Sequence, residues 1–271
     1  MATTVSDSGP AADRYRRAQA ALVRMLMRDL RGLRRLIVPA RLRQTVPDWI
    51  DAVHALVGQY GTASATLAAE HYETQRADAE ARGRFTAEPA VSPPDEQVDA
   101  SLRWALKDVW ERDETTASVA QQEPLDVRLE QAQKKAEGVA QRLVLDQGRE
   151  TVRQAVRRDR DAVAYARAAA LGACSFCKLM ASRGAVYKTA ETAGRDADER
   201  FEGNASVVKF HDNCHCAIIP VFRGQRFELS EHAAEWDRLY REYAQGHSGE
   251  QLRRFRRALA EHDRYPLPAA H

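Results

Sequence analysis

The segment Arg24–Ile37, "RMLMRDLRGLRRLI", decides the fold class of this 271-residue chain. Its apolar residues recur at steps of four, three and four, which is the period of an α-helix. They are Leu26, Leu30, Leu33 and Ile37. Arginines repeat the same steps two positions earlier, about 200° round the helix and so on its opposite face. They are Arg24, Arg28, Arg31 and Arg35. We therefore predict a helix from Pro10 to Ile37 with one apolar side and one cationic side.

The cationic side of this helix has two interpretations. An arginine face commonly does no more than keep a core helix soluble. A handful of guanidinium groups on one face can also dock on an acidic partner or bind DNA phosphates. The whole chain carries a net charge of only +2, so an electrostatic partner would have to be bound by a local cluster. The candidate clusters are Arg24, Arg28, Arg31 and Arg35, and the basic run Arg253, Arg254, Arg256 and Arg257.

Helical patterns continue on both sides of this segment. Asp48, directly after Pro47, is expected to cap a second helix, and Asp95 is expected to start a third after a proline-rich loop. Residues 126–173 have the pattern of one long helix or two consecutive ones. Near the other end of the chain, Ser230 and Ser248 are expected to cap two short helices. About the first 170 residues are thus predicted to be nearly all helix.

A different composition begins after Gly172. Short strand-like runs appear at 184–187, 207–211 and 216–222. All four cysteines of the chain lie in this region, in two groups that each have the spacing of a chelating pair. They form the patterns Cys174-x-x-Cys177 and His211-x-x-Cys214-x-Cys216, with His215 between the last two cysteines.

These residues predict a structural zinc site. The preferred ligands are Cys174, Cys177, His211 and either Cys214 or Cys216, because zinc takes four N or S ligands in a tetrahedron. The segment has few large apolar residues, so a metal cross-link would supply stability that packing cannot. Disulfides, free thiols and a catalytic role are the alternatives.

Compartment and motif content decide between those alternatives. The first residues lack a signal-peptide pattern and no run approaches the roughly 18 apolar residues of a membrane span, so we expect a soluble protein made in the cytosol without a membrane partner. In a reducing cytosol, clustered cysteines are more often metal ligands than disulfides. The sequence contains no HExxH, GxSxG or P-loop motif, and we expect no enzyme activity.

The cysteine segment also resembles a known family. "ACSFCKLMASRGAVY" at 173–187 and "FHDNCHCAIIPVF" at 210–222 are similar to the signature of MuF-like minor head proteins of tailed bacteriophages. The residues that carry the resemblance are Cys174, Cys177, Gly184, Tyr187, His211, Cys214, Cys216 and Pro220. It implies a virion protein inside the capsid near the portal, acting in head assembly, DNA packaging or ejection. The partners it implies are portal and capsid proteins, with packaged DNA as a further one.

Together these observations predict a mainly α fold in three parts. An extended helical N-terminal body at 1–170 docks on the portal or capsid, a small zinc-stapled α+β knuckle module follows at 171–225, and C-terminal helices occupy 226–271. Two alternatives remain open: a zinc-stapled DNA-binding protein, and a capsid maturation protease, a label that some relatives of the family carry. The chain has no room for an appended enzyme after Phe222, which argues against the protease.

Overall fold

The computed structural model describes residues 3–110, 123–186, 214 and 216–265. Its elements are mostly helices, which confirms the mainly α fold. In chain order they are β1 (Thr3–Ser6), α1 (Pro10–Leu33), the 3₁₀ turns η1 (Arg34–Leu36) and η2 (Pro39–Arg41), α2 (Leu42–Asp78), α3 (Asp95–Ala105), α4 (Leu125–Arg158), β2 (Ala162–Ala168), α5 (Ser175–Ser182), β3 (Ala217–Phe222), β4 (Gln225–Glu228), α7 (Glu231–Tyr243) and α8 (Gln251–His262).

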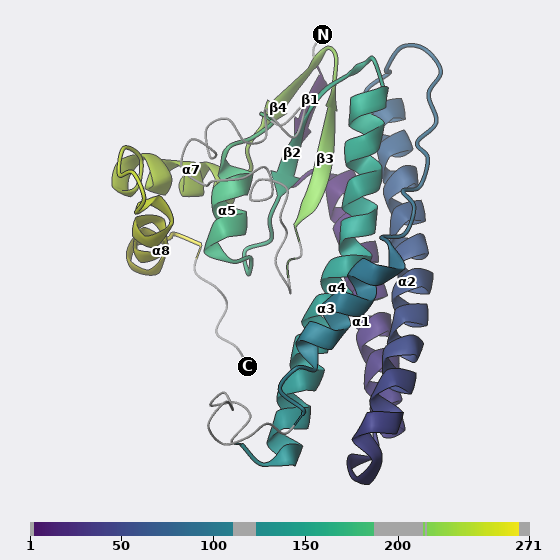
Figure 1. Ribbon diagram of the computed structural model, residues 1–271. Helices are drawn as coiled ribbons and strands as arrows, with labels where there is room; N and C mark the ends of the chain where they lie inside the picture. The colour runs from purple at the N-terminus through teal and green to yellow at the C-terminus, as the bar shows by residue number, and fades with distance from the viewer. Residues whose placement is uncertain (1–2, 111–122, 187–213, 215, 266–271) are drawn as a thin grey trace.

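Three long helices, α1, α2 and α4, run side by side and form an elongated bundle that α3 crosses (Figure 1). Leu26 and Leu30 of α1 are fully buried, together with Trp49 of α2 and Leu102 of α3. The helices α2 and α4 approach closely at Gly148, where an added Cβ would lie 2.9 Å from the backbone oxygen of Ser64. Glycine is needed here because any side chain would separate the two helices.

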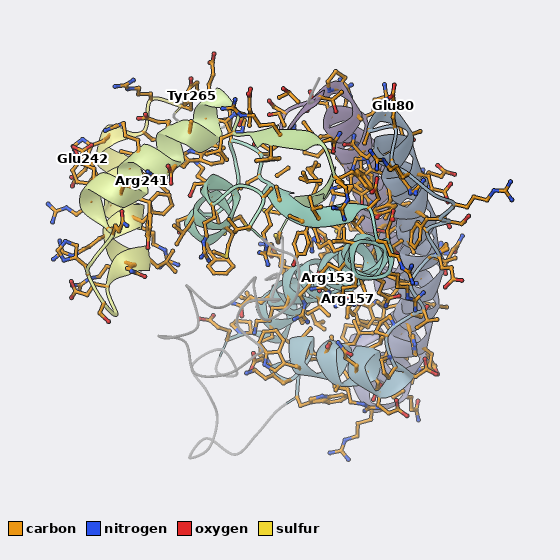
Figure 2. All side chains as sticks on the ribbon, turned by 90° about the horizontal axis from the view of Figure 1, so that it is seen from above. Glu80, Arg153, Arg157, Arg241, Glu242 and Tyr265 are labelled. Carbon is orange, nitrogen blue, oxygen red and sulfur yellow. The ribbon has the colours of Figure 1, made fainter. Side chains whose placement is uncertain are left out.

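Two small sheets lie beside one half of the bundle (Figure 1). Strands β2 and β3 are antiparallel and pair from Ala162 with Phe222 to Ala168 with Ala217. Strands β1 and β4 are parallel, so residues 3–6 lie beside residues 225–228. Helices α7 and α8 pack on α5 on the side of the sheets away from the bundle, as the view from above shows (Figure 2).

The buried apolar residues form two cores. One fills the bundle between α1, α2, α3 and α4. The other joins one end of the bundle to β2, β3, α5, α7 and α8, and it includes Tyr72, Phe222, Trp236 and Phe255, with 0% exposure each. Three of the cysteines belong to this second core. The cysteine region is therefore packed against the helical body, and the division of the chain into three domains stays a prediction.

Several predicted starts are confirmed. Helix α3 begins at Asp95, and strand β3 covers residues 217–222. Ser230 caps α7, since its Oγ accepts a hydrogen bond from the backbone nitrogen of Ala233 at 3.3 Å. The strand-like runs at 184–187 and 207–211 lie partly or wholly outside the described residues.

Other predicted bounds are wrong. Helix α1 ends at Leu33 and is followed by a 3₁₀ turn. Ile37 is buried but lies beyond the end of the helix. Helix α2 begins at Leu42, six residues before Asp48, with Pro47 inside it. Helix α8 is capped at Glu250 rather than at Ser248.

The largest correction concerns the end of the predicted helix over residues 126–173. Helix α4 ends at Arg158, and Ala162–Ala168 form strand β2. These alanines favour a helix intrinsically, but the segment is buried against β3, and tertiary pairing overrides a weak local preference.

No helix within the described ranges is long and apolar enough to cross a membrane.

Candidate metal centre

The cysteines are brought together by the β2–β3 pair. Because Ala168 pairs with Ala217, the residues after β2 lie beside the residues before β3. Cys174 and Cys177 follow β2 at the start of α5, and Cys214 and Cys216 directly precede β3. Cys174 is the N-cap of α5, and its Sγ accepts a hydrogen bond from the backbone nitrogen of Cys177 at 3.3 Å. The two cysteine groups singled out in the sequence therefore meet at one place.

Three sulfur atoms form a compact buried cluster. The Sγ atoms of Cys177, Cys214 and Cys216 all lie within 4.8 Å of one another, and those of Cys177 and Cys214 are 3.3 Å apart. The three side chains are buried, whereas Cys174 is exposed. None of the four cysteines is in a disulfide. Sulfur ligands of a tetrahedral zinc ion lie about 3.8 Å apart, given Zn–S bonds of about 2.3 Å, so this spacing suits a zinc ion.

The donor set fits a metal with soft ligands. Three buried thiols could supply three of the four positions of a structural metal site. Cys174 lies beside the cluster, with its sulfur accepting from the backbone nitrogen of Cys177, but it does not belong to the group of three mutually close sulfur atoms. The sequence left open whether Cys214 or Cys216 completes the site, and both belong to the described cluster. His211, the other predicted ligand, and His215 lie outside the described residues.

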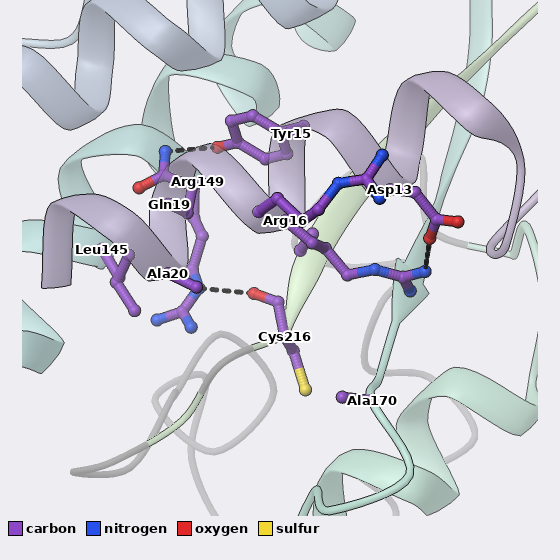
Figure 3. A pocket seen from close by; sticks show the side chains of 11 residues that line it. Asp13, Tyr15, Arg16, Gln19, Ala20, Leu145, Arg149, Ala170 and Cys216 are labelled. Carbon is purple, nitrogen blue, oxygen red and sulfur yellow. Dashed lines mark hydrogen bonds and ion pairs between the residues drawn. The ribbon is translucent and has the colours of Figure 1, made fainter. Parts of the chain in front are cut away.

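A buried arginine supports the cluster from the helical bundle. Arg149 of α4 is 3% exposed, and its guanidinium donates to the backbone oxygen of Cys216 at 3.0 Å, as Figure 3 shows. It also donates to the backbone oxygen of Cys214 at 2.7 Å. Its remaining terminal nitrogen pairs with Asp146 at 2.7 Å. Sequence reasoning missed this residue. The available signal was its place on the apolar side of α4, four residues after Leu145 and three before Val152.

Electrostatics in the cluster favour one thiolate at Cys214. Hydrogen bonds from the thiols of Cys177 and Cys216, and then the positive charge of Arg149, hold the pKa of Cys214 far below its ordinary value. The pKa of Cys177 is raised by its hydrogen bonds with Cys174, Cys214 and Cys216 and by burial. A metal ion would have to displace the remaining thiol protons, so its affinity should fall as the pH falls.

A pocket of about 510 Å³ adjoins the cluster on the side of α1 (Figure 3). Cys216 and Arg149 line it, together with Arg16, Arg17 and Tyr15 of α1. Tyr15 accepts a hydrogen bond from Gln19 at 3.0 Å, and Arg16 pairs with Asp13. The pocket therefore opens beside the proposed ligands and has a cationic wall.

The predicted arginine face of α1 is present but largely compensated. Arg24 and Arg35 are exposed. Arg28 pairs with Asp29 at 2.9 Å, and Arg31 pairs with Glu137 of α4 at 3.1 Å. Two of the four arginines of the stripe are thus paired, Arg28 within α1 and Arg31 across to α4, so the stripe offers less free charge than the sequence predicted.

Comparison with known proteins gives one match. A protein-family model described as VG15 protein matches residues 7–244, which include α1 to α7 and the whole cysteine cluster. No curated protein and no solved structure matches the chain.

Proposed function

Because the chain belongs to the VG15 protein family, a phage-related family, we propose that it is a minor head protein of a tailed bacteriophage. In this proposal the protein lies inside the head near the portal. The bundle of α1, α2 and α4 docks on portal or capsid protein. A zinc ion at the cysteine cluster fixes a smaller second layer, which consists of the two sheets with α5, α7 and α8, to that bundle.

The observation that carries this proposal is the buried three-sulfur cluster. It stands where the MuF-like signature has its two cysteine groups, and it contains Cys177, Cys214 and Cys216. The cluster also has a mechanical connection to the bundle, since Arg149 of α4 binds the backbone of two of these residues. A metal ion there would tie α5, the start of β3 and α4 into one unit, which suits a structural part of a particle.

The protease alternative has less support from the described residues. Ser230, His232 and Asp7 lie together, but the hydroxyl of Ser230 donates to Asp7 at 2.8 Å and also caps α7. In a hydrolytic triad the imidazole stands between the serine and the carboxylate. Here the serine bridges the other two groups, and Asp7 also accepts from the Ser230 backbone nitrogen at 2.7 Å. This geometry favours a helix cap that anchors the N-terminal segment.

Metal content tests the structural site. We expect about one zinc ion per chain after purification under reducing conditions. The variant Cys177→Ser should lose the metal and unfold its second layer at lower denaturant concentration. Ser175→Ala, an exchange beside the cluster that removes no thiol, is the matched control. Metal-free wild-type protein with four reactive thiols would contradict the zinc site.

Particle composition tests the head-protein function separately. A phage with a stop codon in this gene should produce heads that lack the chain and have defects in assembly, packaging or ejection. Mass spectrometry of wild-type particles should find the chain in few copies. Absence from purified particles would refute the proposal, and unchanged incorporation into procapsids built without a portal would refute portal docking.

A further inference from the structure

The connection between α1 and α2 carries concentrated positive charge at one end of the bundle. Residues 30–47 contain five arginines and no aspartate or glutamate. Arg31 is paired with Glu137, and the other four form what we call the arginine tip. These four residues are Arg34, Arg35, Arg41 and Arg43. The tip lies at the end of the bundle away from the sheets, as the α1–α2 turn in Figure 1 shows.

The backbone at the tip is held in a defined shape. Residues 34–41 form two successive 3₁₀ turns, closed by hydrogen bonds from Ile37 to Arg34 and from Arg41 to Val38. The hydroxyl of Thr45 accepts from the backbone nitrogen of Val38 at 3.1 Å and donates to the oxygen of Arg41 at 3.0 Å. Ile37 is buried beneath them. The arginines are therefore displayed from an ordered turn.

The charge of the tip is not neutralised within the described part of the chain. No ion pair involves any of its four arginines there, whereas most exposed arginines elsewhere have an acidic partner. Arg35, Arg41 and Arg43 are exposed and Arg34 is half-buried. Four like charges this close raise the free energy of the folded state, and an anionic partner would relieve that repulsion.

The chemistry of the tip favours phosphate over a protein surface. Protein interfaces need a desolvated apolar centre. The large apolar side chain that the tip exposes is Leu36, and its exposed fraction is only 37%, so the tip offers little apolar surface. Guanidinium groups match phosphate oxygens with paired donors. We propose that the arginine tip binds the phosphate backbone of double-stranded nucleic acid without reading its sequence. This binding depends neither on the zinc site nor on the head-protein function.

Binding of the full chain to a 20-base-pair duplex, measured over a salt series, tests this. Each phosphate contact adds about 0.9 to the slope of log affinity against log salt, so four contacts add about 3.6. Between 50 and 200 mM salt those contacts alone account for about a 100-fold loss of affinity. Replacing all four tip arginines by glutamine should remove that part of the slope. Replacing them by lysine should keep the slope, because the charge is kept.

The matched control removes four other exposed arginines that have acidic partners. They are Arg28, Arg241, Arg253 and Arg257, each at least 70% exposed. This control changes the net charge equally, so it should leave most of the slope intact. Equal loss in both glutamine variants, or no duplex binding by the wild-type protein, would overturn the proposal. Tip-dependent binding of polyglutamate in preference to duplex would also overturn it and would indicate an acidic protein partner.

Discussion

Replacing Arg149 by methionine should weaken both the fold and the metal site. Methionine keeps much of the buried volume but removes the donors to the backbone oxygens of Cys214 and Cys216. Both residues are nearly inaccessible, at 1% and 3% exposure, so water replaces the lost donors poorly. Each unsatisfied buried acceptor costs about 1–3 kcal/mol, which gives about 4 kcal/mol in the free energy of unfolding. Asp146 adds little, because its side chain is 38% exposed and can be hydrated.

The metal site should respond in the same direction. Arg149 orients the backbone of two proposed ligands and would balance the excess negative charge of a zinc ion bound there by thiolates. Loss of such a supporting group typically lowers metal affinity about 10- to 100-fold. We expect that decrease in a competition titration against a chromogenic chelator, with a lower urea midpoint measured with and without zinc.

Arg157→Met is the matched control for this prediction. Arg157 lies on the same helix, is 45% exposed and pairs with Glu150 at 2.7 Å. Exposed pairs contribute about 0–1 kcal/mol, so this variant should resemble the wild type in both assays. Arg149→Lys should be intermediate, since one ammonium group cannot serve both oxygens and Asp146. If Arg149→Met had the metal affinity and urea midpoint of Arg157→Met, the supporting role of Arg149 would be refuted.

Two further predictions concern stability. Burial lowers the pKa of His71 from 6.5 to about 4. Between these two values the unfolded state binds a proton at His71 and the native state does not. The free energy of unfolding should therefore fall by about 2 kcal/mol from pH 7.5 to pH 5. His71→Phe should lose this pH dependence in urea titrations and exposed His247→Gln should keep it; equal slopes would contradict the assignment. In thermal melts, Gly148→Ala should destabilise by about 1–3 kcal/mol through overpacking, whereas Gly58→Ala, with open space at its Cβ, should stabilise by up to about 1 kcal/mol. Similar shifts in both variants would argue against a close contact at Gly148.

The helical fold could be predicted from the sequence, because apolar residues repeat at the helical spacing over long segments. Leu26 and Leu30 repeat on one side of α1 and are fully buried, as their spacing predicts. A helix end could be predicted where the capping residue is chemically specific, as at Ser230. The start of α2 at Leu42 was harder to predict, because burial of Val46 and Trp49 extends the helix back past Pro47. The sequence pattern near a helix end does not reveal such packing, because the packing depends on residues far away in the chain.

The cysteine groups could be predicted as one site, because their spacings are chemical signals in themselves. The residue that supports this site, Arg149, could not be predicted in the same way. In the sequence, Arg149 cannot be distinguished from the other arginines of a basic helix. Its role is visible only in the structure, where β3 packs against α4 and the guanidinium binds the backbone of Cys216. Strand β2 was missed for a similar reason, since "AVAYARA" has no strong strand preference and depends on β3 for its pairing. The arginine stripe shows the opposite case, where the sequence could not reveal that Arg31 is neutralised by Glu137.

The parallel pairing of β1 with β4 constrains how the protein is made. Residues 3–6 leave the ribosome early, but their partners at 225–228 follow more than 200 residues later. At a synthesis rate of about 5–20 residues per second, that delay lasts about 10–45 seconds. The α1–α2 hairpin needs only nearby residues and can form during this interval. The nascent chain thus carries residues 3–6 unpaired while the hairpin behind them can already form, and residues 3–6 are among the last to reach their native position.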